Sequence, residues 1–262
     1  MTERFWAIDC GNTRLKVTCF GADGRIEWRR AYDSDDVESL MGDLEKNRVR
    51  RAGMSCVGKI DPRIVETLGN ELDDGFMLLS PSSAAGLDIR YDSVRTLGAD
   101  RKLTARAAAS LYEGESLLVV DAGTAITLDL VEKGGVFAGG NIAPGLQLRF
   151  RALNEQTARL PKLSVVGQSE PLMAFGTSTP EAIMAGVAGG VLDEICLAAM
   201  RAIKMGVEKL ILTGGDAPYL ERMLRERFRQ LDIRMEIIHE PDLLAKGLRI
   251  VYILHHENES KD

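Results

Sequence analysis

The sequence predicts an α/β fold of two similar domains, in which helices flank mixed sheets, and two observations support this. First, an apolar, β-rich run ending in Asp, a small residue and Gly occurs twice, within Phe5–Phe20 and within Leu117–Val131. Second, each copy is followed by segments in which strand and helix patterns alternate. The aspartates of the two copies, Asp9 and Asp121, are 121 − 9 = 112 residues apart, about the length of a small domain. We therefore expect domains at residues 1–114 and 115–262.

The elements of the first half follow from the period of the apolar residues. A hairpin is expected over the first copy of the motif. Next come a strand at 25–31, a helix at 36–46, a strand at 51–56, a helix from Asp61 and a strand at 76–79. An alanine-rich helix follows at 102–111 and closes the first half.

The second half repeats the hairpin and then alternates strands with helices. We expect strands at 135–141, 209–213 and 235–238. Helices are expected at 145–153, 182–200, 218–228 and 242–254. Strands first in a meander and later alternating with helices are typical of a mixed sheet with crossover helices.

The two Asp-small-Gly turns indicate phosphate binding. Gly11 and Gly123 let the backbone approach a ligand where a Cβ would clash. Donors from Asn12, Thr13, Thr124 and Ala125 would line the turns. A carboxylate repels phosphate, so Asp9 and Asp121 would serve a cation. A single DxG turn is more often only a good hairpin turn, and the duplication favours the functional interpretation.

A third motif lies between the two copies, at Tyr91–Arg101. Asp100 falls at or near the N-terminus of the alanine-rich helix, where a carboxylate commonly caps the helix and complements its dipole. Arg101 follows it, and a guanidinium binds a carboxylate or phosphate through two parallel hydrogen bonds. An acid, a basic clamp and an upstream aromatic residue together indicate a site for an acceptor substrate, although capping alone also explains Asp100.

Three further turns carry glycines or hydroxyls. Gly139–Gly145 links a strand to a helix, which suits either a phosphate or a tight turn. Thr177–Ala182 opens a helix with Ser178 or Thr179 as its N-cap, which leaves the other hydroxyls for a ligand. Thr213-Gly214-Gly215 ends a strand where an adenosine could bind.

Composition narrows the class of protein. The 262 residues are 45% hydrophobic and 27% charged with net charge −6, which is typical of a globular chain and disfavours nonspecific nucleic-acid binding. Cys10, Cys19, Cys56 and Cys196 form no CxxC pair, so neither structural zinc nor a disulfide framework is expected. Cys10 lies in the first turn, where a small buried thiol is favoured over a reactive one. No signal peptide is expected, and the apolar run 182–192 is too short to span a bilayer, so we expect a cytoplasmic protein.

Together these motifs resemble the type III pantothenate kinases. The resemblance rests on Asp9–Lys16, Gly98–Arg101, Asp121–Ala125 and Gly139–Gly145, with Ser178-Thr179 and Thr213–Gly215 behind them, and runs from about Phe5 to Leu254. It implies membership of the actin, sugar kinase and acetate kinase group, whose two ribonuclease-H-like domains hold ATP in a cleft between them. The implied reaction is the ATP-dependent phosphorylation of the primary hydroxyl of pantothenate, the first step of coenzyme A biosynthesis.

The resemblance also implies roles for individual residues. ATP would be bound by Asp9, Gly11, Asn12, Thr13 and Lys16 of the first loop and by Gly123 and Thr124 of the second. Mg²⁺ would be organised by Asp9, and a monovalent cation, K⁺ or NH₄⁺, would be bound by Asp121. Asp100 would be the catalytic base. Pantothenate would contact Tyr91, Gly98, Ala99, Asp100, Arg101 and Thr179.

The resemblance further implies a homodimer that packs through the helices at 145–153 and 182–200, whereas the pattern alone equally fits helices of the core. No nucleic-acid or membrane partner is expected. Two alternatives stay open from the sequence. One is a kinase for another small hydroxylated acceptor, because fold does not fix function. The other is a nonenzymatic transcriptional accessory protein of the same fold.

Overall fold

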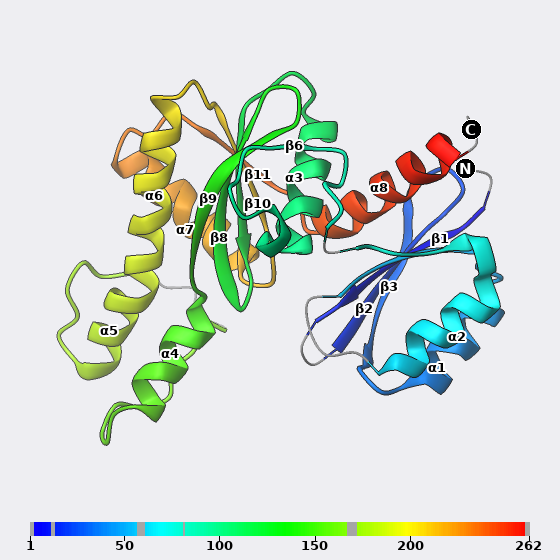
Figure 1. Ribbon diagram of the computed structural model, residues 1–262. Helices are drawn as coiled ribbons and strands as arrows, with labels where there is room; N and C mark the ends of the chain where they lie inside the picture. Colours follow the sequence, from blue (N-terminus) through cyan, green and yellow to red (C-terminus); the bar gives the residue numbers. More distant parts are fainter. Residues whose placement is uncertain (1–2, 12–13, 57–60, 81, 167–171, 260–262) are drawn as a thin grey trace. The chain divides into compact units, whose positions relative to one another are not determined.

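The computed structural model describes residues 3–11, 14–56, 61–80, 82–166 and 172–259. By its internal contacts the chain forms two compact units. The first unit comprises Met1–Leu111 and Asp242–Asp262, and the second comprises Tyr112–Pro241. Each is an α/β unit in which a mixed sheet packs against helices (Figure 1).

The sheet of the first unit has the strand order β3-β2-β1-β4-β5. Strands β1, β2 and β3 form an antiparallel meander, and β4 and β5 continue from β1 in parallel. The strands are β1 (Phe5–Cys10), β2 (Arg14–Phe20), β3 (Ile26–Asp33), β4 (Arg51–Cys56) and β5 (Phe76–Leu78). A two-residue strand, β6 (Asp88–Ile89), follows later in the chain and does not belong to this five-stranded sheet.

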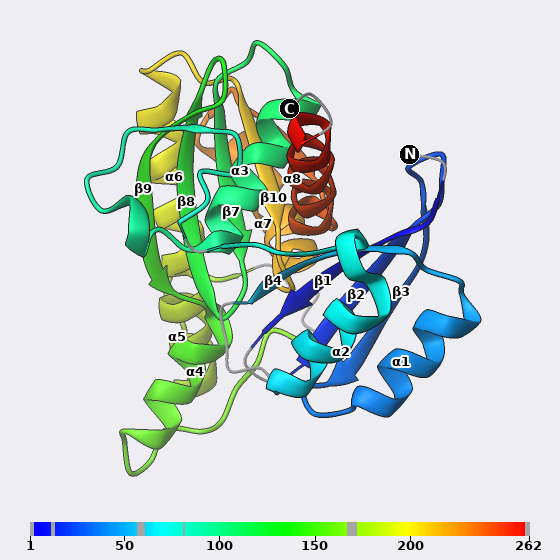
Figure 2. The same ribbon diagram turned by 45° about the vertical axis from the view of Figure 1, so that its right-hand side comes forward.

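Alternation of side chains along β1 and β4 gives this sheet two buried faces. Trp6, Ile8 and Cys10 face a core that includes helices α1 (Val37–Lys46) and α2 (Pro62–Leu72). Both helices present buried residues at i, i+4 spacing, for example Leu40 and Leu44 of α1. Figures 1 and 2 show α1 and α2 together on one side of the strands.

The opposite face of the sheet packs against the helices α3 (Ala99–Leu111) and α8 (Leu243–Glu259). Phe5 and Ala7 of β1 share this core with Leu103 of α3 and Leu248 of α8. Gly247 brings α8 close to α3, because a Cβ there would overlap the backbone carbonyl of Leu103. The helix that the sequence assigned to the second domain therefore packs in the first unit, because its apolar stripe is buried against α3, β1 and β4. The predicted domain boundary between residues 114 and 115 remains a prediction. It differs from the two contact units because it assigns α8 to the second domain.

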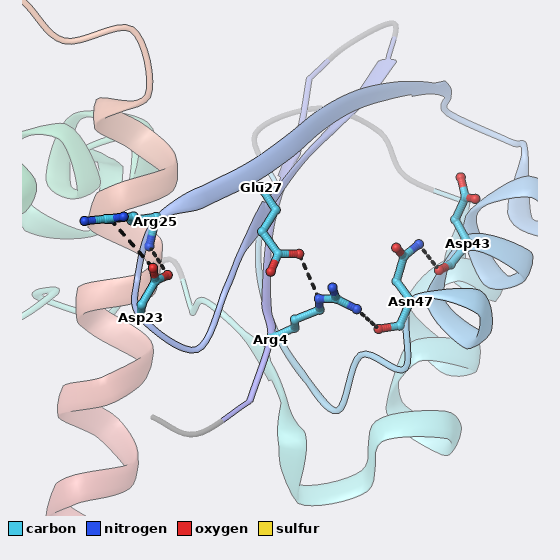
Figure 3. A network of polar contacts seen from close by, with 6 residues as sticks. All are labelled: Arg4, Asp23, Arg25, Glu27, Asp43 and Asn47. Atoms are coloured by element: carbon cyan, nitrogen blue, oxygen red, sulfur yellow. Dashed lines mark hydrogen bonds and ion pairs between the residues drawn. The ribbon is translucent and has the colours of Figure 1, made fainter.

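A polar network ties the edge elements of the first unit to one another (Figure 3). Arg4, which precedes β1, donates from Nε to Glu27 Oε2 of β3 at 2.8 Å and from Nη1 to the carbonyl of Asn47 at 3.1 Å. Asn47 follows α1, and its side-chain amide donates to the carbonyl of Asp43 at 2.6 Å. Asp23 and Arg25 pair within the β2–β3 turn. A surface ion pair contributes only about 0–1 kcal/mol to the stability of the fold. These contacts therefore orient the edge elements more than they stabilise the protein.

The strands of the second unit follow the order β11-β10-β7-β8-β9. Again a hairpin and its neighbour, β7-β8-β9, are antiparallel, and β10 and β11 continue from β7 in parallel. The strands are β7 (Leu117–Ala122), β8 (Ala125–Glu132), β9 (Val136–Pro144), β10 (Lys209–Thr213) and β11 (Glu236–His239). One face of these strands packs against α4 (Leu146–Glu155), α6 (Gly190–Ile203) and α7 (Ala217–Gln230).

A long apolar helical stretch belongs to the second unit. Helix α5 (Thr179–Met184) continues through a π-helical turn at Ala185–Gly189 into α6, and α4 contacts that turn. Among the described residues, this is the one helix, Thr179–Ile203, whose 25 residues are long and apolar enough to cross a membrane, and 44% of its most apolar window is buried. It is longer than the apolar run 182–192 seen in the sequence. A core helix meets the same description, and Val191, Ile195 and Ala199 lie in the core of the second unit.

Candidate active site

The first hairpin places two opposite charges side by side. Asp9 of β1 and Lys16 of β2 are antiparallel register partners, so their side chains share a face. Burial raises the pKa of Asp9, Lys16 opposes that shift, and the nearby charge of Asp100 adds to it. Asp9 is thus within electrostatic range of both Lys16 and Asp100.

The turn that follows Asp9 is closed by its glycine. The amide of Gly11 donates to the carbonyl of Arg14 at 3.1 Å. Asn12 and Thr13, which the sequence assigns to ATP, lie outside the described residues. For this first Asp-small-Gly turn, the structure therefore describes the two ends, Gly11 and Arg14.

Ser55 is a neighbour of Asp9 that the sequence analysis missed. It is the parallel register partner of Asp9 on β4 and is 1% exposed. Its signal in the sequence is a hydroxyl within the predominantly buried strand Arg51–Cys56. A small polar residue here leaves Asp9 a polar neighbour within a buried sheet.

Asp100 lies in the first turn of α3, one residue after the helix begins at Ala99. Its Oδ1 accepts a hydrogen bond from the amide of Arg101 at 2.9 Å. A Cβ at position 98 would overlap that same oxygen, so Gly98 leaves the space that the carboxylate occupies. The motif Gly98–Arg101 therefore holds a carboxylate against the start of a helix, where its negative charge is stabilised.

Arg101 is buried, with 5% of its surface exposed. Its Cζ lies 5.8 Å from the centroid of the Tyr91 ring, an aromatic–guanidinium contact. A buried guanidinium retains its charge, and its planar fork suits a carboxylate. The acid, the clamp and the aromatic residue that the sequence grouped together are thus neighbours in the first unit.

The second hairpin is surrounded by glycines from two other turns. The amide of Gly123 donates to the carbonyl of Ala125 at 3.0 Å, and the amide of Gly145 donates to the carbonyl of Thr124 at 2.8 Å. A Cβ on Gly145 would overlap the backbone of Gly123 and Thr124. Thr124 itself is exposed. The glycine-rich link at the end of β9 therefore packs directly on the second predicted phosphate loop.

The turn after β10 also lies close to the second hairpin, at Asp121 and Ala122. Gly214 has φ +96°, and a Cβ there would lie 2.5 Å from Asp121 Oδ1 and 2.5 Å from the carbonyl of Ala122. The amide of Asp216 donates to that carbonyl at 3.0 Å. The half-buried Asp121 therefore lies close to the backbone at Gly214, next to the carbonyl of Ala122.

Thr179 is the first residue of α5, and Ser178 is the N-cap. The carboxylate of Glu181 accepts hydrogen bonds from the amide and the hydroxyl of Thr177, both at 2.8 Å, and from the amide of Ser178 at 3.0 Å. These bonds, first those of Thr177, hold the pKa of Glu181 below its ordinary value. Ser178 therefore caps α5, and the exposed Thr179 follows a turn that is held by the hydrogen bonds to Glu181.

The described residues contain no group of three His, Cys, Asp or Glu side chains that could hold a metal ion by themselves. Mg²⁺ in phosphoryl-transfer sites usually takes one or two carboxylates together with the phosphates of the substrate and water. Asp9, an oxygen donor at the mouth of a glycine turn, fits that donor set.

Comparison with known proteins relates this arrangement to one family. The family model described as type III pantothenate kinase matches residues 5–199. A type III pantothenate kinase of Porphyromonas gingivalis W83 is 38% identical over 243 residues, which cover 92% of this chain and 94% of the relative. The chain belongs to the type III pantothenate kinase family. Another such kinase, of Rubrobacter xylanophilus, is 30% identical over 268 residues and covers 95% of this chain and 97% of the relative.

Solved structures agree on the fold. The activator of the 2-hydroxyisocaproyl-CoA dehydratase from Clostridium difficile, with bound ADPNP, is similar with a TM-score of 0.55 at 13% identity, over 98% of this chain and 97% of that one. A putative 2-dehydro-3-deoxygalactonokinase from Sinorhizobium meliloti gives 0.54 at 12% identity, over 96% and 99%. At these identities the likeness is one of fold. It is the actin and sugar kinase-like fold that the sequence predicted.

Proposed function

We propose that this protein transfers the γ-phosphoryl group of ATP to the primary hydroxyl of pantothenate, giving 4′-phosphopantothenate in the first step of coenzyme A biosynthesis. Membership of the type III pantothenate kinase family supports the reaction class. The observation that carries the proposal for this chain is the grouping of Asp9, Lys16 and Asp100 in one electrostatic neighbourhood, with the buried Arg101 beside Asp100.

On the acceptor side, Arg101 would bind the carboxylate of pantothenate. A buried guanidinium pays little additional desolvation on binding an anion and offers two parallel donors. Tyr91 would pack along the acceptor, and Gly98 and Ala99 would line it with backbone. Thr179 would offer its exposed hydroxyl to the acceptor.

On the nucleotide side, the loop residues would hold the phosphates. Lys16 would place a cation near them, and Gly11, Asn12, Thr13, Gly123 and Thr124 would offer backbone amides or hydroxyls. Asp9 would hold Mg²⁺, which when bound neutralises charge on the phosphates. Burial raises the pKa of Asp9, and the positive charge of Lys16, its register partner, opposes that rise and favours the ionised carboxylate that Mg²⁺ needs.

Asp100 would orient the acceptor and receive its proton. Phosphoryl transfer proceeds through a loose transition state, in which positioning and charge neutralisation provide most of the rate. The acceptor oxygen bonds to phosphorus as the bond from phosphorus to the leaving oxygen of ADP breaks, and the hydroxyl proton passes to Asp100. The amide of Arg101, which donates to Asp100 Oδ1 at 2.9 Å, fixes the carboxylate for this step.

We further propose that Asp121 binds a monovalent cation, K⁺ or NH₄⁺. A large monovalent cation prefers several oxygen ligands, and backbone approaches Asp121 closely through Gly214. The carboxylate would supply the charge, and the nearby carbonyl of Ala122 would supply a further oxygen.

A homodimer and a cytoplasmic location complete the proposal. Leu197, Met200 and Ile203 are exposed apolar residues at the end of α6, which suits a helix that packs against a second copy. The net charge of −6 supports the absence of a nucleic-acid partner. Sedimentation at low concentration measures the first point directly, and a monomer there would count against the dimer.

The reaction is tested by identifying its product. The purified chain is incubated with ATP and Mg²⁺ and with pantothenate or another small hydroxylated acid, and the acceptor is analysed by mass spectrometry. Phosphorylated pantothenate supports the proposal. Phosphorylation of a different acceptor only would indicate a kinase with another substrate, and no phosphorylation by a folded protein that binds ATP would favour a nonenzymatic role.

A further inference from the structure

Two cysteines lie side by side at the end of the first strand. Cys10 of β1 and Cys56 of β4 are Cα register partners in parallel pairing. Both belong to the core on the α1 and α2 face of the sheet, so their side chains point the same way. The remaining cysteines, Cys19 and Cys196, are also free and buried.

The backbone already has the spacing that a disulfide requires. Neighbouring strands lie about 4.8 Å apart, and the α-carbons of disulfide-linked cysteines are usually about 4.4–6.8 Å apart. Cys10 and Cys56 face each other in register. Closing a bond between them therefore needs side-chain rotation, with little movement of the strands.

The two thiols differ in access. Cys10 is 0% exposed, whereas Cys56 is half-buried. A small oxidant would reach Cys56 first, and Cys10 is in place to resolve the product. This division of roles, one accessible sulfur and one buried neighbour, is what a reversible two-cysteine oxidation needs.

We propose that Cys10 and Cys56 form a reversible oxidation site that takes a hydroperoxide as its oxidant. The sulfur of Cys56 attacks the peroxide, the O–O bond breaks, and a sulfenic acid and an alcohol (water, for hydrogen peroxide) result. The sulfur of Cys10 then attacks the sulfenic sulfur, the S–O bond breaks, and the hydroxide leaves as water with the proton of Cys10. Two thiols have lost two electrons in total, and the peroxide has gained them. A dithiol restores both thiols by exchange.

The site is coupled to the first phosphate loop by direct connection. Cys10 precedes Gly11, whose carbonyl lies 3.8 Å from the sulfur of Cys10 and whose amide closes the turn onto Arg14. A disulfide would draw the sulfur of Cys10 towards β4 and change the backbone at Gly11. Formation of the disulfide is independent of the proposed function, whereas its effect on ATP use rests on that function.

The experiment treats the full chain with hydrogen peroxide, blocks the remaining thiols by alkylation and maps the peptides by mass spectrometry. We expect one disulfide-linked peptide pair that contains Cys10 and Cys56 and disappears with dithiothreitol. ADP release with ATP, Mg²⁺ and pantothenate should fall in proportion to the linked fraction and return on reduction. Each variant is compared with its own reduced state: Cys56→Ser should keep its activity through the treatment, whereas Cys196→Ala should lose it as the wild type does.

Three results would overturn the inference. In the first, Cys10 and Cys56 stay reduced under conditions that oxidise an exposed model thiol. In the second, Cys56→Ser loses activity as the wild type does. In the third, the linked peptide forms while ADP release is unchanged, which removes the coupling to the loop. The peptide map needs no turnover, so a failure of the proposed reaction would not be mistaken for a failure of the disulfide.

Discussion

The carboxylate of Asp100 occupies the space in which a side chain of residue 98 would begin, and glycine at that position leaves it free. Oδ1 of this carboxylate accepts a hydrogen bond from the amide of Arg101 at 2.9 Å. Two residues thus fix where the acid stands, one by a hydrogen bond and one by the absence of a Cβ.

Gly98→Ala should therefore displace Asp100 while the fold is kept. We expect kcat/KM for pantothenate to fall by about 10–100-fold, since a misplacement of about 1 Å can cost 10²-fold. Gly69→Ala in α2 is the matched control, because nothing lies within 4 Å of a Cβ there. The control should keep its activity and gain about 0.5–1 kcal/mol of stability. Equal activity of the two variants would show that Gly98 does not position Asp100.

Asp100→Asn should lower kcat by about 100-fold or more, the usual size of a general-base effect. The amide keeps the size of the side chain but cannot receive the proton. Binding of ATP, measured by calorimetry, should be largely unchanged, because Asp100 acts on the acceptor. Turnover close to that of the wild type would remove Asp100 from the mechanism.

Exchange of potassium for sodium should raise the KM for ATP if Asp121 binds the monovalent cation. In Asp121→Asn the difference between the two salts should shrink, because the anionic ligand is gone. The measurement is a set of ATP saturation curves in each salt at constant ionic strength. Identical curves for the wild type in potassium and sodium would contradict the assignment.

The turn before Thr179 should loosen in acid. The pKa of Glu181 lies below its ordinary value of 4.5 because the ionised carboxylate accepts hydrogen bonds from Thr177 and Ser178. Its stabilisation is therefore complete above about pH 4.5 and is lost as the pH falls through the lowered pKa. The protection of the amides of Thr177 and Ser178 against hydrogen exchange, relative to the intrinsic exchange rate at each pH, should fall over that range. In Glu181→Gln this protection should not change with pH over the same range. A wild type whose protection is also independent of pH would refute the capping role of Glu181.

Much of the fold could be predicted because its signals are local. Apolar and polar residues alternate along Arg14–Phe20, the second strand of the first hairpin, and β4 and β10 have the bounds that the sequence predicts, Arg51–Cys56 and Lys209–Thr213. The packing of α8 with the first unit could not be predicted, since an apolar stripe does not say which sheet will bury it. The π-helical turn that joins α5 to α6 likewise carries no signal of its own.

The candidate site divides in the same way. Asp9 and Asp121 stand two residues before a turn glycine and Asp100 stands two residues after Gly98, and these glycines mark them in the sequence. Ser55 becomes visible only through strand register, because it stands 46 residues from Asp9 (55 − 9). Lys102, next to the predicted site residue Arg101, is buried, and that burial lowers its pKa. Burial of one charged residue among several depends on tertiary packing, which local sequence does not encode.

The most direct test of the proposed function is the release of ADP by the purified chain with ATP and Mg²⁺, with and without pantothenate, in potassium and in sodium buffer. We predict release that requires pantothenate and is faster in potassium. ADP release at the same rate without pantothenate, or none in any buffer from a folded protein that binds ATP, would contradict the assignment of this chain as a pantothenate kinase.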